Sequence, residues 1–359
     1  MNIQSIKFYS KLMIRSLAGG QINFYKLRTL FTNLYYAWRR IPDVPYGPSA
    51  LWIEPVNFCN LSCDGCWVPD KQKYTKNKPM DVELFKRNID SIKDTLILLV
   101  LQMSGEPFLH KSIIEMIRYA SDNNIVVWTS TNCSFKTDDN WGKDVVDSKL
   151  DTLYISVSGM KQETYELYHQ GGNICNVKEN IKKITEAKKA KKSKTPYLFF
   201  RVLITDKNRQ ELTKIKEIAS YLNIAVHTRV INTSYEYQGI PIKEPDSTDV
   251  EIEATFEPEN LQNHCYGLWI APALTSSNRL LPCCYDWLYP PYMGSINEKL
   301  TVKDIWHSQS FNQFRKQILK NRSAFDSCRY CDNSIGFKDG FSKRHNHITI
   351  RFKGSHSLV

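Results

Sequence analysis

Short apolar runs alternate with amphipathic segments through the middle of the chain. Six runs rich in apolar, β-branched and aromatic residues are typical of buried strands: 51–56, 96–101, 125–130, 153–157, 198–204 and 224–228. Between them lie segments whose apolar residues recur at helical spacing: 82–93, 112–123, 143–148, 177–192 and 210–221. Strands that alternate with helices in this way predict a parallel α/β sheet.

The length of this repeat indicates how far the sheet closes. Residues 51–230 comprise 180 residues, or 30 per strand–helix unit over six units, whereas a closed barrel of eight units takes about 250 residues. We therefore expect an α/β fold with a (β/α)6 partial TIM barrel that is open on one side. From residue 231 to 334 the alternation stops, and Cys, Pro, Trp and Tyr become prominent. This composition predicts a small cysteine-rich domain held together more by cysteine ligation than by a large core.

Two amphipathic segments precede the barrel. Residues 3–17 and 24–40 predict helices that are separated by Gly19 and Gly20. In the second segment, six apolar and aromatic residues form one stripe at helical spacing: Phe24, Leu27, Phe31, Leu34, Tyr35 and Trp38. We expect residues 1–50 to be a basic helical extension that packs over the open side of the barrel. Contact with an anionic membrane and binding of a leader peptide are the two other interpretations.

The charge of the chain lies mainly at its two ends. The 359 residues include 48 Lys and Arg against 37 Asp and Glu, for a net charge of +11. Residues 1–50 contribute +6 and residues 335–359, a basic C-terminal tail, contribute +4, which leaves +1 for the rest. A nucleic-acid enzyme would more often carry its basic surface around the active site, so nucleic acid is not expected as a partner.

The cellular location is predicted from what the N-terminal region contains. No apolar run is long enough to cross a bilayer, and Lys7, Lys11 and Arg15 interrupt any signal-peptide core. We expect a cytoplasmic protein, with peripheral membrane contact through the N-terminal helices as the alternative. Ten cysteines in such a chain favour metal or redox chemistry over a disulfide framework.

The first group of cysteines directly follows the first predicted strand. Cys59, Cys63 and Cys66 therefore lie on the first βα loop, where barrel folds mount their catalytic groups. Three thiolates within eight residues can ligate three irons of a cubane cluster and leave the fourth iron open to another ligand. A zinc site would need a fourth ligand nearby, and this loop has none.

This CxxxCxxC pattern in a six-unit partial barrel resembles the radical SAM (S-adenosylmethionine) superfamily, over about residues 51–230. The resemblance implies a [4Fe–4S] cluster held by Cys59, Cys63 and Cys66, with SAM chelating the open iron. An electron from the reduced cluster would cleave SAM to a 5′-deoxyadenosyl radical, which abstracts a hydrogen atom from the substrate. A low-potential electron donor such as flavodoxin or ferredoxin would be the partner that reduces the cluster.

Further SAM contacts follow from the same resemblance. The run Gly105, Glu106 and Pro107 after the second strand resembles the family's GGEP motif, which binds the SAM amino group, with Ser104 in place of the first glycine. Polar residues at the ends of later strands are candidates for the SAM ribose and carboxylate: Ser130, Asn132, Ser156, Ser158 and Arg201. Relatives commonly carry an aromatic residue before the last cysteine, but this chain has Gly65 there, so Trp67 is the candidate to cover adenine.

The second group of cysteines lies beyond the barrel. Read alone, a CxxC with two distant cysteines could also be structural zinc. Because it follows a radical SAM domain, the stretch from Cys265 to Cys331 is similar to the SPASM/twitch extension. It is similar in particular to the single-cluster domain of 2-deoxy-scyllo-inosamine dehydrogenases. The resemblance implies a second, auxiliary [4Fe–4S] cluster with four ligands: Cys265, Cys283, Cys328 and Cys331. Full ligation by cysteine would make this cluster an electron acceptor.

Three cysteines remain outside these ligand sets. Cys133 and Cys175 are most simply buried thiols, and Cys284 is an alternative ligand, a packed thiol or a hydrogen-atom donor.

The interpretations of the two cysteine groups and of Cys284 lead to three different functions. The first is a radical SAM oxidoreductase that oxidises a sugar-like alcohol or a peptide C–H bond. The second is a radical epimerase of a peptide or sugar with Cys284 as hydrogen donor. The third is a non-catalytic metal–cysteine scaffold that binds membrane or nucleic acid.

Overall fold

The computed structural model describes seven stretches of the chain and five separate positions. The stretches are 19–63, 76–204, 208–230, 250–254, 263–284, 293–325 and 348–352, and the separate positions are 16, 66, 68, 69 and 328. Most of the first predicted helix, residues 3–17, and most of the basic tail lie outside the described residues. No helix in the described part of the chain has the length and apolar character needed to cross a membrane.

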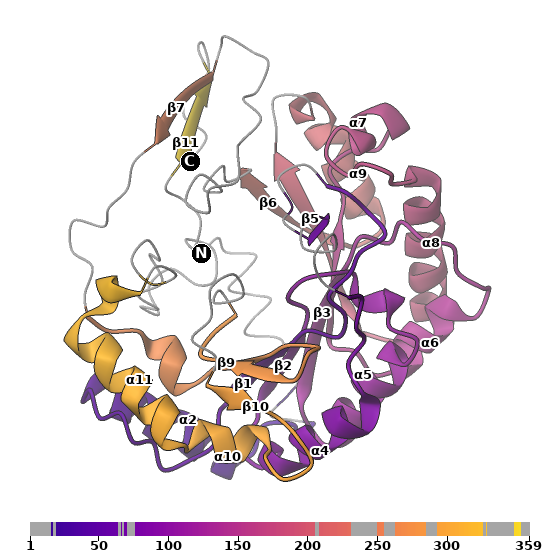
Figure 1. Ribbon diagram of the computed structural model, residues 1–359. Coiled ribbons are helices and arrows are strands. Elements are labelled where there is room, and N and C mark those ends of the chain that lie inside the picture. The colour runs from indigo at the N-terminus through magenta and orange to yellow at the C-terminus, as the bar shows by residue number, and fades with distance from the viewer. Residues whose placement is uncertain are drawn as a thin grey trace.

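Six parallel strands form the centre of the structure and lie side by side in chain order (Figure 1). These strands are β1 (Ala50–Ile53), β2 (Leu98–Leu101), β3 (Val126–Thr131), β4 (Thr152–Ser156), β5 (Tyr197–Ile204) and β6 (Ala225–Val230). The helices of the barrel are α4 (Val82–Ile92), α5 (Ile113–Asp122), α6 (Trp141–Asp147), α7 (Gln162–Glu166), α8 (Ile174–Ala190) and α9 (Leu212–Tyr221). The predicted α/β partial barrel is confirmed, with every predicted strand present in the predicted order.

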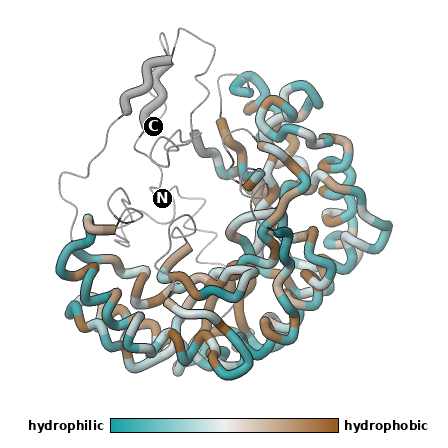
Figure 2. Tube along the Cα trace, viewed as in Figure 1, coloured by the Kyte–Doolittle hydropathy of each residue, from teal (hydrophilic) through white to brown (hydrophobic). Residues whose placement is uncertain are grey.

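The sequence folds this way because the barrel strands are apolar on both of their faces. Successive residues of a strand point to opposite faces, and both members of such pairs are buried, as for Val126 and Val127 in β3 and for Phe199 and Phe200 in β5. A parallel sheet covered by helices needs such strands, because neither face meets water. Figure 2 shows the hydrophobic segments concentrated in the strands, while hydrophilic segments lie on the outer turns of the helices.

The second domain extends the same sheet. The short strands β8 (Ala273–Leu274), β9 (Arg279–Leu281) and β10 (Gly294–Ser295) continue it beyond β1. Strand β8 pairs parallel with β1, β9 pairs antiparallel with β8, and β10 pairs antiparallel with β9. Two helices, α10 (Val302–Trp306) and α11 (Gln309–Lys320), follow, and the 3₁₀ turn η4 (Tyr266–Trp269) precedes β8.

The buried aromatic side chains of this second domain correct one expectation. Trp269, Trp306 and Phe311 are fully buried and belong to the same hydrophobic cluster as the barrel core. Burying three such side chains contributes several kcal/mol, at roughly 2–3 kcal/mol each. The described part of this domain therefore shares a large core with the barrel, which its composition had not suggested, and the contribution of cysteine ligation stays a prediction. Part of the C-terminal tail is also in a sheet: β11 (Ile348–Phe352) pairs antiparallel with β7 (Val250–Ala254).

Helix α2 (Phe24–Trp38) is placed differently from the expectation. It does not cover the open side of the barrel with its aromatic stripe. The Lys26 ammonium donates to Asn124 O at 2.6 Å, in the turn before β3, and Asn33 Nδ2 donates to Gly47 O at 2.9 Å, just before β1. The helix therefore lies at the amino-terminal ends of the strands, with polar residues inward, because these backbone carbonyls need donors.

Candidate functional site

The cysteine loop begins where β1 ends, at the carboxyl end of the sheet. Cys59, Cys63 and Cys66 are half-buried there. The Cys59 Sγ accepts from the Leu61 N–H at 3.4 Å and lies 3.6 Å from Asn132 Nδ2. Burial is the main reason that the pKa of the Cys59 thiol rises to about 12, and burial with the negative charge of its neighbours raises that of Cys63 further.

The chemistry of this donor set fits an iron–sulfur cluster. The charges of neighbouring thiolates help to raise the pKa of Cys59 and of Cys63, and no cationic side chain of the described residues is among the causes of either shift. Iron ions supply the positive charge that would hold such thiols as thiolates. Among the described residues, no three His, Cys, Asp or Glu side chains converge on a point where one metal ion could sit. A cubane spreads its cysteines over separate irons, so its ligands need not meet at one point.

The turn after β2 presses against the start of this loop. Gly105 has a φ of +74°, and a Cβ at this position would lie 2.5 Å from Phe58 O and 2.6 Å from Val56 O. The next residue, Glu106, donates its backbone N–H to Phe58 O at 2.9 Å. Only glycine allows this approach, so the predicted motif fixes the backbone immediately before Cys59.

The Glu106 side chain joins the ends of two strands. It is only 3% exposed. One carboxylate oxygen accepts from Asn132 N–H at 2.7 Å, just after β3, and the other from Phe108 N–H at 3.2 Å. Burial outweighs these hydrogen bonds and raises the pKa of the Glu106 carboxyl from 4.5 to about 7. The structure thus gives this side chain a positioning contact, and its contact with SAM stays a prediction.

The raised pKa of Glu106 predicts a pH-dependent stability. The folded protein holds this proton more tightly than the unfolded chain, so the contribution is full below pH 4.5 and is lost as the pH rises to about 7. The shift corresponds to about 3 kcal/mol. We expect the free energy of unfolding, measured in denaturant across this pH range, to fall more steeply for the wild type than for Glu106→Gln. The exposed Glu163→Gln is the control, and an equal slope in Glu106→Gln and wild type would contradict the assignment.

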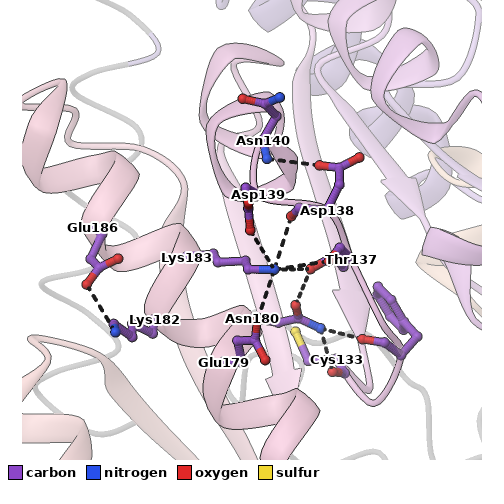
Figure 3. Close-up of polar contacts among 11 residues, drawn as sticks. Cys133, Thr137, Asp138, Asp139, Asn140, Glu179, Asn180, Lys182, Lys183 and Glu186 are labelled. Carbon is purple, nitrogen blue, oxygen red and sulfur yellow. Dashed lines mark hydrogen bonds and ion pairs between the residues drawn. The ribbon is translucent and has the colours of Figure 1, made fainter.

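The loop after β3 is held in place by helix α8 (Figure 3). Asn180 Nδ2 donates to Cys133 O at 2.9 Å and to Phe135 O at 2.8 Å. The Lys183 ammonium donates to Thr137 O at 3.0 Å and Asp138 O at 3.1 Å. These bonds fix the segment that follows Asn132. Asn132 in turn donates through Nδ2 to Asn60 Oδ1 at 2.9 Å, within the cysteine loop.

A buried histidine that the sequence analysis missed lies beside the second cysteine. His169 is 3% exposed, with Nδ1 3.4 Å from Cys63 Sγ and Nε2 3.2 Å from Ser158 Oγ. Burial lowers the pKa of this imidazole to about 4. Ser158, predicted as a SAM contact, is 1% exposed and directs its hydroxyl to this histidine. No spacing motif marks His169, because it follows the short helix α7 over 100 residues from Cys63.

The other predicted strand-end residues lie on adjacent strands. Ser156 of β4 pairs in register with Arg201 of β5, and Ser130 of β3 pairs with Tyr154 of β4. All three predicted side chains are half-buried. The Arg201 guanidinium lies 4.8 Å from the centre of the Tyr154 ring, in a cation–π contact. The structure therefore brings these residues to one region of the sheet, at the carboxyl ends of neighbouring strands.

A second buried carboxylate links the two domains. Glu54, one residue after β1, is 2% exposed. Its Oε2 accepts from the Ser276 N–H at 3.0 Å and hydroxyl at 2.8 Å, and its Oε1 accepts from the Ser104 hydroxyl. The sequence analysis missed this role, although a carboxylate at the end of an apolar strand is a usable signal. Ser104, which replaces the family's glycine, thereby joins the motif to the second domain.

The later cysteines are described only in part. Four of them are half-buried: Cys265, Cys283, Cys284 and Cys328. The fifth, Cys331, lies outside the described residues. The Cys328 N–H donates to Phe325 O at 2.9 Å. Trp67, the predicted adenine contact, also lies outside the described residues. The ligand set of the second cluster therefore stays a prediction.

The two isolated cysteines differ from each other. Cys133 is fully buried, as expected. Cys175 is exposed, which corrects the expectation of a buried thiol. It lies in the first turn of α8, next to Ile174 and Val177, which take the buried positions of that helix. The helical period therefore places Cys175 on the solvent side.

Two protein-family models match this chain. Residues 53–219 match the Radical SAM superfamily, and residues 265–332 match SPASM, an iron–sulfur cluster-binding domain. The two matches follow each other in the order of the two structural regions, the barrel and its C-terminal extension.

Individual proteins with similar sequences or structures are distant relatives. The tungsten-containing aldehyde ferredoxin oxidoreductase cofactor-modifying protein of Pyrococcus furiosus is 22% identical over 325 residues, which is 78% of this chain and 86% of that protein. The S-adenosyl-L-methionine-dependent 2-deoxy-scyllo-inosamine dehydrogenase of Niallia circulans is 36% identical over 61 residues, 17% of this chain and 24% of that enzyme. Among solved structures, SuiB of Streptococcus suis has a TM-score of 0.54 at 15% identity, covering 75% of this chain and 68% of SuiB.

Proposed function

We propose that this chain, which carries a radical SAM domain followed by a SPASM iron–sulfur cluster-binding domain, is an oxidoreductase that removes two electrons from a substrate C–H bond. The observation that carries the proposal is the group of three half-buried thiols after β1, of which Cys59 and Cys63 have raised pKa values. The substrate class is a sugar-like alcohol or a peptide.

The domains imply the cofactors. A radical SAM domain binds SAM and a [4Fe–4S] cluster, and a SPASM domain binds additional iron–sulfur clusters. In this chain Cys59, Cys63 and Cys66 would hold the first cluster. When bound, the reduced cluster and SAM supply a 5′-deoxyadenosyl radical that can abstract a hydrogen atom. We propose flavodoxin or ferredoxin as the class of electron donor.

The side chains around the cysteine loop hold its thiolates in place. An iron-bound thiolate can only accept a hydrogen bond, so His169 would donate from Nδ1 to Cys63. Its Nε2 is then an acceptor, and the Ser158 hydroxyl donates to it. Asn132 would donate from Nδ2 toward Cys59 in the same way. These donors spread the negative charge of the thiolates and fix their positions.

The strand ends supply the proposed contacts for SAM itself. The cationic Arg201 suits its carboxylate, and Ser130 and Ser156 on adjacent strands suit its ribose hydroxyls. Gly105 and Glu106 fix the turn beside the cysteine loop, where the backbone would meet the SAM amino group. We propose that these residues orient SAM, while Ser158 acts through His169.

The four later cysteines provide the oxidative step. With Cys265, Cys283, Cys328 and Cys331 as ligands, the auxiliary cluster has no open iron and would accept the electron left on the substrate. The second candidate is epimerisation, in which the half-buried Cys284 returns a hydrogen atom to the substrate. Solvent deuterium separates the two, because an exchangeable thiol would transfer deuterium into an epimerised product, whereas the oxidised product would gain none.

The proposal is tested by anaerobic reconstitution with iron and sulfide. We expect about eight irons per chain, four for each cluster, and formation of 5′-deoxyadenosine from SAM when reductant is added. Zinc in place of iron, with no cleavage of SAM, would favour the non-catalytic scaffold instead. Four irons with cleavage of SAM would keep the radical chemistry and remove the auxiliary cluster from the proposal.

A further inference from the structure

Helix α2 carries its apolar residues on the outside. Its buried residues are Lys26, Thr29, Asn33 and Ala37, three of them polar. Its most exposed large hydrophobic residues lie on the opposite stripe: Phe24 at 82%, Phe31 at 65%, Trp38 at 64% and Tyr35 at 51%. A helix on the surface of a globular domain normally shows the reverse arrangement.

The inward face of α2 is fixed by hydrogen bonds that a rotation would break. The Lys26 ammonium donates to Asn124 O at 2.6 Å and to Gln21 O at 3.2 Å, and Asn33 Nδ2 donates to Gly47 O at 2.9 Å. The Ala37 carbonyl lies 2.8 Å from His264 Nε2 in the second domain. Turning the aromatic stripe inward would leave these buried groups without partners, so the stripe stays outside.

The charge around the stripe indicates what covers it. Residues 1–42 contain seven Lys and Arg and no Asp or Glu. Arg28, Arg39 and Arg40 are exposed on α2 or just after it. The guanidinium of Arg39 lies 6.0 Å from the centre of the Trp38 ring, and that of Arg28 lies 5.9 Å from the Tyr46 ring. An anionic surface complements this face, whereas the same face of a second copy would bring like charges together.

The position of α2 leaves the cysteine loop free. Its contacts at Asn124 and Gly47 lie at the amino-terminal ends of β3 and β1. Cys59, Cys63 and Cys66 lie beyond the carboxyl end of β1, at the opposite end of the sheet. A surface that covered α2 would therefore not close the entrance to the cysteine site.

We propose that the outer face of α2 docks on a lipid bilayer with anionic headgroups. Phe24, Phe31 and Trp38 would enter the boundary between headgroups and acyl chains, and Arg28 and Arg39 would contact the headgroup phosphates. Aromatic side chains with a polar end, such as Trp38 and Tyr35, favour this depth in a membrane. The contact would be peripheral, along one helix of 15 residues. It does not depend on the proposed radical chemistry.

The test is sedimentation of the full-length, anaerobically reconstituted protein with lipid vesicles. We expect binding to phosphatidylcholine vesicles that contain phosphatidylglycerol and not to phosphatidylcholine alone, and we expect salt to weaken it. The double variant Phe31→Ser with Trp38→Ser should bind about tenfold or more weakly. Charge reversal by Arg28→Glu with Arg39→Glu should also remove binding. SAM and reductant are left out, so failure here is independent of catalysis.

A matched control is available at another exposed aromatic residue. Tyr221, at the end of α9, is 90% exposed, and Tyr221→Ser should bind vesicles like the wild type. Circular dichroism checks that all variants are folded, which is expected because the changed side chains are exposed. Absence of vesicle binding by the wild type would overturn the proposal, as would equal binding by the double variant. A wild-type dimer that the double variant dissociates, without vesicle binding, would assign the face to a second copy instead.

Discussion

Replacement of Cys59, Cys63 and Cys66 by alanine is expected to abolish formation of 5′-deoxyadenosine while the protein keeps about half of its iron, four of eight atoms. These three thiols are the only ligands proposed for the SAM-binding cluster, so their loss removes the electron source for cleavage. The later cysteines lie in a domain whose buried Trp269, Trp306 and Phe311 join the barrel core and lie outside the cysteine loop, so its cluster should remain. Iron analysis and a 5′-deoxyadenosine assay on the reconstituted variant measure both effects.

The matched control for this variant is Cys175→Ala. Cys175 is exposed at the start of α8 and belongs to neither proposed ligand set, so the variant should keep all of its iron and its cleavage of SAM. Undiminished cleavage of SAM by the triple variant would contradict the assignment of the cluster. A triple variant that is folded but holds no iron would contradict the separate auxiliary site.

Substitution of Gly105 by alanine is expected to be the most destabilising single change near the site. The new Cβ would lie 2.5 Å from Phe58 O and 2.6 Å from Val56 O, both backbone atoms, and the residue would keep a φ of +74°. Strain from this backbone conformation and from the overpacked contact together cost about 4 kcal/mol. Because Phe58 precedes Cys59, the displaced backbone should also reduce the iron bound on reconstitution.

Gly20→Ala separates the two causes of this loss. Gly20 has the same φ of +74°, but a Cβ there would meet no atom within 4 Å. It should therefore show only the conformational strain, about 1–2 kcal/mol, with no change in iron content. Free energies of unfolding in denaturant and iron analysis of both variants give the comparison. Equal losses in the two variants would show that the contact with Phe58 contributes nothing.

The barrel was predictable because its signal is local. Each strand is a short apolar run, and each helix shows its own period, so neither needs knowledge of its neighbours. Parallel pairing then places the loops after β1, β2 and β3 at one end of the sheet. The cysteine triplet and the run from Gly105 to Pro107 could be located this way, and the family matches agree with that interpretation.

The contacts that complete the site were not predictable in the same way. His169 meets Cys63, and Glu54 meets Ser276, across more than 100 residues of sequence, and neither pair has a characteristic spacing. The same limit applies to Ser158, whose place at a strand end suggested SAM but whose hydroxyl lies against His169. Side-chain contacts of this kind depend on how separate elements pack, and no local period encodes that.

Helix α2 shows most clearly which features the sequence determines and which features only the tertiary structure determines. The sequence determined that residues 24–38 form an amphipathic helix with one aromatic stripe, because helical spacing alone aligns those side chains. Only the tertiary structure decided that the stripe faces outward. The carbonyls of Asn124 and Gly47 need donors that Lys26 and Asn33 provide, and these bonds set the rotation of the helix against the hydrophobic effect on its own apolar face.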